Sequence, residues 1–472
     1  MKYVLLVLAV LLPGVAFADD PKPDDRARED ALFGGEEEKP AVATAADATA
    51  SDYGDERMAG GEAKENTELL YKDRSQLGGF LYMRTSASYN QGAKFSDIGL
   101  GNSNLFDAYF DTRLNDRVRA FVRGRVLYNP LASAAAATGV NSQSALGAPI
   151  STDTTKALLN QMWLKFDVGR TVFLTVGQQF VRWGTTRFWN PVDVLNTTKV
   201  NPLAFFDERV GVPMVKLHIP IEKLGWNLYA IALTDSATTL DRLGAAVRAE
   251  ALFGHTEVGV ATIFRKGVDP KLGVDVSSGL GDFDLTGEFG MVFPQHGTVA
   301  WQLSAGLSYT WAYREDDSLV LAVEYFHNDQ GLTLDGAYNQ LKNSFIAQTA
   351  TSLTPLYTGR DYVGAVATVT SPGSLNDATL SLISLSNLTD KSGTFQLNFS
   401  NLFLTDLTVE AYAGVVFGDG ELRGYLPYVK SRLGTDPQFI ALPTDFQQQV
   451  AGYFLNSLPS LLRAGVNLRV NL

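Results

Sequence analysis

The feature that most limits the possible folds is an alternation of apolar and polar residues in segments of about ten residues. The last segment is the clearest, and its two interleaved sets are Leu462, Ala464, Val466, Leu468, Val470 and Leu472 against Arg463, Gly465, Asn467, Arg469 and Asn471. Successive side chains of a β-strand lie on opposite faces of the sheet. The alternation therefore predicts a series of strands, each with one apolar face and one polar face.

The connections between these segments follow a second pattern. We place eighteen strands from residue 79 onward, with the weakest alternation at 271–279 and 377–388, and sixteen strands as the alternative count. Connections after even-numbered strands are short. The long connections all follow odd-numbered strands, near 129–156, 183–211, 329–360 and 418–460. Outer-membrane barrels separate short periplasmic turns from long external loops in this way. The sequence thus predicts an all-β fold, a transmembrane, antiparallel, up-and-down β-barrel whose apolar faces contact outer-membrane lipid.

The N-terminal region differs from the rest of the chain. Residues 1–18 have a basic residue, an apolar run and an Ala16-Phe17-Ala18 cleavage site, as in a secretory signal peptide. Residues 19–76 hold 17 acidic and 8 basic residues and few aromatics. We predict that this segment is disordered, periplasmic and able to bind a periplasmic partner. The barrel is expected to occupy 77–472. The chain has no cysteine and no basic patch of the kind that nucleic acid requires.

If the apolar faces contact lipid, the charged residues between them face the lumen. The candidate pore-lining residues are a basic group and an acidic group: Arg84, Arg117, Arg119, Arg123 and Arg125, with Asp107 and Asp111 beside them, and Asp284, Glu288, Glu324 and Glu410 on the opposite wall. Facing walls of opposite charge would set ion preference and orient dipolar solutes. Alternatively, the charges pair between neighbouring strands and only brace the wall.

One long connection has the composition of an ordered loop. Its characteristic residues are Arg182, Trp183, Gly184, Trp189, Asn190, Pro191, Asp193 and Asn196. Gly and Pro favour tight turns, Asn and Asp cap them, and the large aromatic rings require burial. We predict that this loop folds into the barrel and constricts the pore. The alternative is a lid packed over the rim.

The Trp-Gly…Asn-Pro-x-Asp-x-x-Asn pattern of this loop resembles that of large porin-like bacterial outer-membrane barrels of unknown function. The resemblance covers the signal segment, the strand before the motif and the loop. It implies an outer-membrane location without a defined substrate. Many such barrels end in Phe, which the barrel-assembly machinery reads, whereas this chain ends in Leu472. Gly465, Leu468 and Val470 keep the expected spacing of that signal.

The four histidines, His218, His255, His296 and His327, have no spacing typical of a catalytic triad or a metal site. We therefore expect no enzyme activity, no metal and no cofactor. The predicted function is passive diffusion of small hydrophilic or weakly charged solutes through a porin-like channel in the bacterial outer membrane. The alternatives are an occluded surface barrel with an adhesive or structural role and, less favoured, an outer-membrane enzyme.

Overall fold

The structure, a computed structural model, describes residues 75–472 apart from 116, 133–153, 197, 236, 296, 315–316, 347–352, 434, 442–443 and 445–459. The predicted signal peptide, residues 19–74 of the acidic segment and residues 133–153 therefore lie outside the described residues. The first strand begins at Ser75, so it includes the last two residues that the sequence assigned to the acidic segment.

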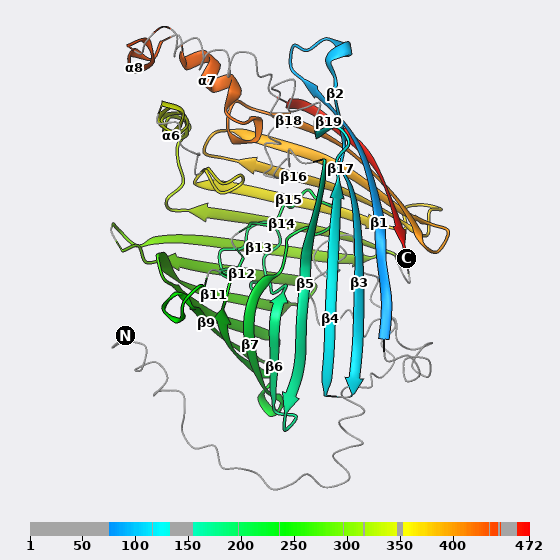
Figure 1. Ribbon diagram of the computed structural model, residues 1–472. Helices are drawn as coiled ribbons and strands as arrows, with labels where there is room; N and C mark the ends of the chain where they lie inside the picture. The colour runs from blue at the N-terminus through cyan, green and yellow to red at the C-terminus, as the bar shows by residue number, and fades with distance from the viewer. Residues whose placement is uncertain are drawn as a thin grey trace. The chain divides into compact units, whose positions relative to one another are not determined.

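Within these described residues, nineteen strands form one antiparallel sheet (Figure 1). Their bounds are β1 (Ser75–Asn90), β2 (Gly99–Asn102), β3 (Asn104–Asn115), β4 (Val118–Tyr128), β5 (Thr155–Val168), β6 (Val172–Gln179), β7 (Val212–Ile221), β8 (Trp226–Leu233), β9 (Gly244–Phe253), β10 (Thr256–Arg265), β11 (Val268–Leu280), β12 (Phe283–Val292), β13 (Ala300–Ala312), β14 (Ser318–Asn328), β15 (Asp361–Thr370), β16 (Ala378–Asn387), β17 (Ser392–Phe403), β18 (Leu407–Phe417) and β19 (Ser460–Asn471).

The sheet closes on itself because β1 pairs with β19, with Arg84 opposite Asn467. On its other edge β1 pairs with both β2 and β3, so these two strands occupy one position in the wall. Every other strand pairs with its neighbours in sequence. The barrel thus has eighteen strand positions, as predicted, and the two weakly alternating segments form β11 and β16.

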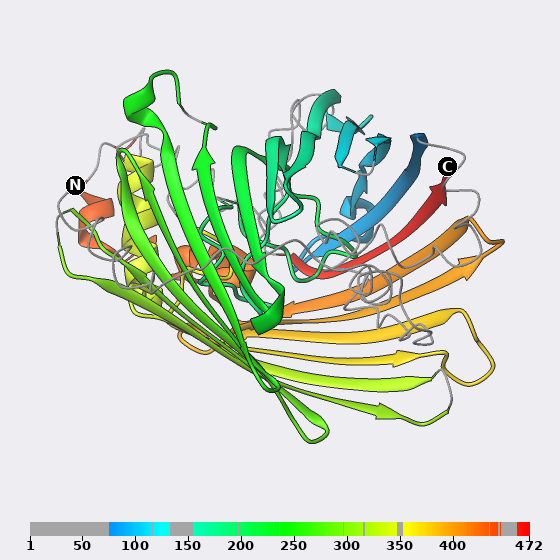
Figure 2. The same ribbon diagram turned by 90° about the horizontal axis from the view of Figure 1, so that it is seen from below.

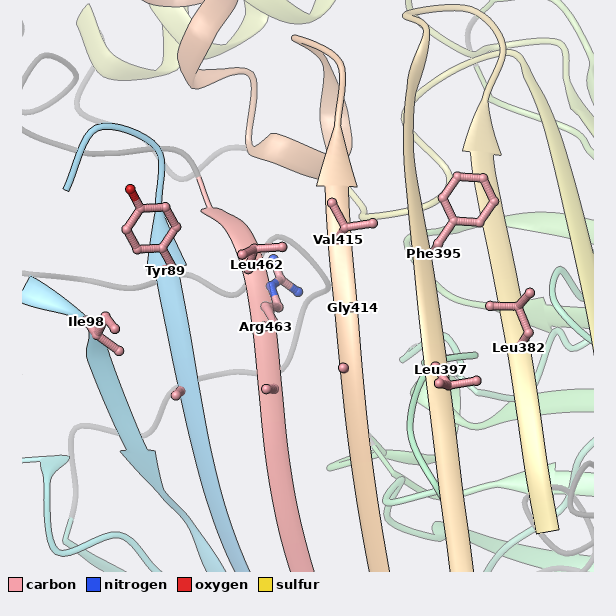
Figure 3. Close-up of a pocket in the computed structure, with 12 residues that line it drawn as sticks. Tyr89, Ile98, Leu382, Phe395, Leu397, Gly414, Val415, Leu462 and Arg463 are labelled. Carbon is pink, nitrogen blue, oxygen red and sulfur yellow. The ribbon is translucent and has the colours of Figure 1, made fainter. Parts of the chain in front are cut away.

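Alternation places apolar side chains on the outer face of the wall. On β14, for example, Leu321 and Val323 are exposed, whereas Val320 and Glu324 are buried on the inner face. The outer face also has a groove, and its lining is mainly apolar. A shallow groove over β16–β19 and β1 (Figure 3) contains Ala87, Ala413 and Ala464 as one cross-strand row. An apolar outer surface of this kind suits contact with lipid tails.

The long connections follow β4, β6, β14 and β18, and the last two carry helices (Figure 1). The helices are α6 (Leu334–Ile346), α7 (Leu426–Leu433) and α8 (Pro437–Ile440), and the single 3-10 turns are η2 (Phe95–Asp97), η3 (Glu222–Leu224), η4 (Leu240–Arg242) and η5 (Glu421–Arg423). Within the described ranges, no helix is both long and apolar enough to cross a membrane.

Candidate pore and its inward loop

The connection from β6 to β7, residues 180–211, lies against the inner face of the wall (Figure 2). It contacts the wall where glycines leave room for its side chains. A Cβ built on Gly273 of β11 would come within 2.9 Å of Val192, and one on Gly364 of β15 within 2.5 Å of Phe188. The neighbouring residue Val274 is exposed on the outer face. The loop and the lipid-facing side chains therefore occupy opposite sides of the same strands.

Glu288 of β12 holds the first part of this loop. Its carboxylate accepts hydrogen bonds from the backbone N–H groups of Thr185 (2.7 Å), Thr186 (2.8 Å) and Val192 (3.0 Å). The Thr186 hydroxyl donates a further bond of 2.6 Å. Glu288 is 1 % exposed. Hydrogen bonds to a charged acceptor are stronger than neutral ones, so this buried carboxylate is a strong anchor for the loop backbone.

Glu324 of β14 holds the next three residues in the same manner. It accepts from the backbone N–H groups of Arg187 (2.8 Å), Phe188 (3.0 Å) and Trp189 (2.8 Å), and from the Ser304 hydroxyl (2.8 Å). Five successive N–H groups, from 185 to 189, thus bind two carboxylates of the wall. Both acidic residues are buried on the inner face, and both are covered by the loop.

The polar residues of the loop motif fold the loop itself. The Asn190 side chain accepts from the Asp193 N–H (2.9 Å), and Asn196 donates to the Asp193 carboxylate and to the Val181 carbonyl, each at 2.7 Å. Asp193 also pairs with Arg209 at 2.8 Å. Gly184 has a φ of 102°, and a Cβ there would lie 2.3 Å from Glu288 Oε1. The motif therefore encodes turns and a close approach to the wall.

Two other motif residues stabilise the conformation of this loop. Arg182 donates to the Thr186 carbonyl at 2.7 Å. Pro191 packs on Gly290 of β12, where a Cβ would lie 3.0 Å from the proline ring. Each residue thus fixes either a turn or a contact with the wall.

The aromatic residues of the loop are buried between it and the wall. Trp189 is fully buried and stacks on Phe326 of β14, with ring centroids 5.7 Å apart and planes 5° apart. Its indole N–H donates to the Leu356 carbonyl at 2.8 Å. Trp183 belongs to a second buried cluster with Val192 and Leu195. These rings give the loop an apolar core of its own inside the barrel.

The predicted basic residues lie beside carboxylates. Asp107 of β3 accepts two hydrogen bonds from Arg125 of β4, at 3.0 and 2.8 Å, and lies 3.6 Å from the Arg123 guanidinium. Arg119 binds Asp111 through two nitrogens, at 2.9 and 2.5 Å. Pairing between neighbouring strands, the alternative weighed from the sequence, thus occurs for both aspartates. Arg117 lies just before β4 and pairs with Asp167 at 2.6 Å.

The basic wall also holds the far end of the loop. Arg84 of β1 pairs with the Glu208 carboxylate at 2.6 Å, and Arg125 donates to the Glu208 carbonyl at 2.7 Å. The acidic wall binds backbone donors near the start of the loop, and the basic wall binds acceptors near its end. The loop therefore spans from one charged wall to the other.

The two remaining acidic candidates do not anchor this loop. Glu410 of β18 is buried and accepts from the Tyr82 hydroxyl of β1 and from Asn467 of β19 (3.2 Å). It therefore lies beside the basic wall, and the prediction that placed it on the opposite wall is wrong, because the closure of the sheet brings β18 and β19 next to β1. Asp284 lies near the start of β12 and is exposed. The four acidic candidates therefore do not form one cluster among the described residues.

Charge is distributed unevenly around the wall. Strands β3–β8 carry four net positive charges with His218 neutral, from cations Arg113, Arg119, Arg123, Arg125, Lys156, Lys165 and Lys216 and from carboxylates Asp107, Asp111 and Asp167. Strands β10–β14 carry four net negative charges, from Arg265 and Lys271 and from Glu257, Asp269, Asp275, Asp284, Glu288 and Glu324. Such asymmetry produces a field across the interior even when many charges are paired.

A carboxylate cluster above β15–β18 was not anticipated from the sequence. Glu421 of η5 accepts from the Tyr362 hydroxyl (2.6 Å) and from Asn387 (2.8 Å), and its own N–H donates to Asp390 (2.7 Å). Burial raises the pKa of Glu421 to about 7, against the opposing effect of the Tyr362 hydrogen bond, and the nearby Asp390 raises it further. Burial also raises the pKa of Asp390.

The stability of this region is expected to depend on pH. Because the folded-state pKa of Glu421 exceeds its ordinary value of 4.5, the folded protein binds the proton more tightly than the unfolded chain does. This contribution is fully present below pH 4.5 and is lost as the pH rises to about 7. We expect the melting temperature of the native chain, relative to Glu421→Gln, to fall by several degrees across that interval. If the difference in melting temperature between the native chain and Glu421→Gln stayed constant from pH 4 to 8, this prediction would be wrong.

Histidines within the described residues have simple surroundings. His218 stacks on Tyr229 at 4.5 Å and hydrogen-bonds Asn227, and His327 pairs with Asp361 at 2.8 Å. His255 is exposed in the turn before β10, and His296 lies outside the described residues. In the described part of the chain, no three His, Asp or Glu side chains are grouped so that they could hold a metal ion.

Comparison with known proteins gives a likeness of fold. No protein-family model matches the chain, and no curated protein matches its sequence. Among solved structures, a BenF-like porin from Pseudomonas fluorescens Pf-5 aligns with a TM-score of 0.50 at 10 % identity, over 84 % of this chain and 98 % of that one. OccAB4 of Acinetobacter baumannii aligns with a TM-score of 0.49 at 9 % identity, over 85 % and 98 %. OccAB1 of the same organism aligns with a TM-score of 0.48 at 11 % identity, over 84 % and 96 %. The closed antiparallel barrel of this chain therefore has the fold of the BenF-like porin.

Proposed function

We propose that the chain is an outer-membrane channel for passive diffusion of small hydrophilic or weakly charged solutes. The observation that carries this proposal is a closed eighteen-position wall with an exposed apolar outer face and a charged inner face. Barrels of this strand number are wide enough to enclose an aqueous lumen. The fold likeness to solved porins supports the same function.

The inward loop would set the size limit of this channel. It lies on the inner face and is anchored to both the acidic and the basic wall. In this proposal Arg119, Arg123 and Asp284 line the passage, while Glu288, Glu324 and Arg84 act through the loop that they hold. The barrel-assembly machinery and a periplasmic partner of residues 19–76 remain predicted partners.

The test is single-channel recording of the refolded, heat-modifiable protein in planar bilayers under a salt gradient. We expect stepwise conductance with a reproducible ion preference. A folded barrel that passes no current would overturn the proposal. It would favour an occluded barrel with an adhesive or structural role, for which the dense packing around Trp189 is the supporting observation.

A further inference from the structure

A row of aromatic side chains crosses the inner face of the wall near the end with short connections. Tyr109 of β3, Phe121 of β4 and Trp163 of β5 stack in succession. Their centroids are 5.8 and 5.3 Å apart, and the ring planes differ by 21° and 19°. The adjacent residues Phe110 and Met162 are exposed on the outer face. The three stacked rings therefore belong to the inner face.

The row continues across the next three strands. Lys165 lies over the Phe173 ring of β6 at 5.7 Å, and Phe173 is 5.9 Å from His218 of β7. His218 stacks on Tyr229 of β8. The register agrees, because His218 is directly opposite both Phe173 and Tyr229. We call these six residues, Tyr109, Phe121, Trp163, Phe173, His218 and Tyr229, the aromatic belt.

Cations are interleaved with the rings. The Arg123 guanidinium lies 5.7 Å from the Tyr109 ring and 5.4 Å from the Phe121 ring, and that of Arg119 lies 5.6 Å from Trp163. The belt spans the strands β3–β8, which carry four net positive charges. This net charge already includes Asp107 and Asp111, the ion-pair partners of Arg125 and Arg119. The surface therefore favours an anion.

The belt differs from the aromatic core of the loop in its accessibility. All six belt residues are half-buried, whereas Trp189 and Phe326 are fully buried. Phe121 stacks between Tyr109 and Trp163, so its edge is the part of the ring left for a solute. The edge of an aromatic ring carries the positive end of its quadrupole. Such edges attract an anionic group or the face of another flat ring.

We infer that the aromatic belt is a solute-binding site for anions that carry a flat apolar ring. The inference rests on the proposed channel function, for which it names a preferred solute class. The anionic group would be held near Arg119 and Arg123, and the ring would pack against Phe121 and Trp163. A small anion without a ring would gain only the electrostatic part of this attraction, and a ring-bearing cation would be repelled.

Two measurements separate the inference from the proposed function. Equilibrium dialysis of the detergent-solubilised full chain would compare 2-naphthalenesulfonate with methanesulfonate and with a benzyltrimethylammonium cation. Single-channel recording would then measure current block by the same three probes. We expect naphthalenesulfonate to bind at least about ten-fold more tightly than the other two and to block the current at the lowest concentration.

The variants are Trp163→Leu and Phe121→Leu, which keep an apolar side chain, with Trp311→Leu on the exposed outer face as the matched control. An aromatic contact contributes about three- to ten-fold in affinity, so each belt variant should weaken naphthalenesulfonate binding by that factor and the control should not. Equal binding of the two sulfonates, or unchanged binding in both belt variants when heat-modified mobility shows them folded, would overturn the inference. A barrel that binds the probe but conducts no ions overturns the channel function and supports the belt.

Discussion

The Glu288→Gln, Glu324→Gln double variant is expected to conduct at least about twice as much current per open channel as the native chain. The two carboxylates accept six backbone N–H groups of the inward loop, from Thr185 to Trp189 and from Val192. A glutamine has only one acceptor oxygen, and its NH2 group would face backbone N–H groups of the loop, which are themselves donors. Each buried donor left without a partner costs about 1–3 kcal/mol, so the loop should detach from the acidic wall and widen the passage.

Hydrogen exchange gives a readout of the same variant that does not depend on conductance. The amides of residues 185–189 should lose protection, while those of β12 and β14 keep theirs. The control for hydrogen exchange is Asp284→Asn, which removes an exposed carboxylate from β12 without touching the loop. If the double variant loses loop protection and its conductance stays at the native level, the loop does not limit the passage. If protection is unchanged, the two carboxylates do not hold the loop.

The strands could be predicted from the sequence because a period of two survives in any strand with one face to lipid and one to the interior. All eighteen positions were found, including the weak segments that form β11 and β16. The strand β2 (Gly99–Asn102), which is separated from β3 by a break, was not predicted. The break occurs at Ser103, whose carbonyl accepts from the Arg84 guanidinium and whose neighbour Asn104 accepts from the Arg84 N–H. The alternation of apolar and polar residues around Ser103 does not reveal a hydrogen bond to Arg84, which lies 19 residues earlier.

The candidate residues of the loop and wall could be selected from the sequence, but their partners could not. Gly184, Asn190 and Asp193 were singled out for turn formation, and they form such turns. Glu288 and Glu324 were singled out as inward charges, yet they bind backbone groups more than 95 residues earlier in the chain. Every residue except proline has a backbone N–H group, so the sequence does not show which of these groups will bind a given carboxylate. The aromatic belt was missed for a related reason, since its rings come from six strands and only the register aligns them.

Asp107→Ala is expected to destabilise the barrel by about 3–5 kcal/mol, because it leaves a buried guanidinium without its counter-charge. The side chains of Asp107 and Arg125 are only 1 % and 2 % exposed, and Arg125 retains just its bond to the Glu208 carbonyl. The matched control is Asp111→Ala on the same strand. Its partner Arg119 is 24 % exposed, so water can solvate the released charge and the expected loss is about 1 kcal/mol. Urea unfolding in lipid vesicles, followed by tryptophan fluorescence, measures both.

A double variant distinguishes two contributions to the free energy of unfolding: the cost of leaving Arg125 buried without a counter-charge, and the stabilisation that the Asp107–Arg125 pair itself provides. Replacing a whole buried ion pair with apolar side chains is often neutral. Asp107→Ala combined with Arg125→Met should therefore recover most of the lost stability, apart from the bond to Glu208. If the double variant is as unstable as Asp107→Ala alone, the pair itself stabilises the wall and the buried charge is not the cause. Recovery would instead mean that the pair is retained for the loop, since Arg125 links Asp107 to the segment that crosses the lumen.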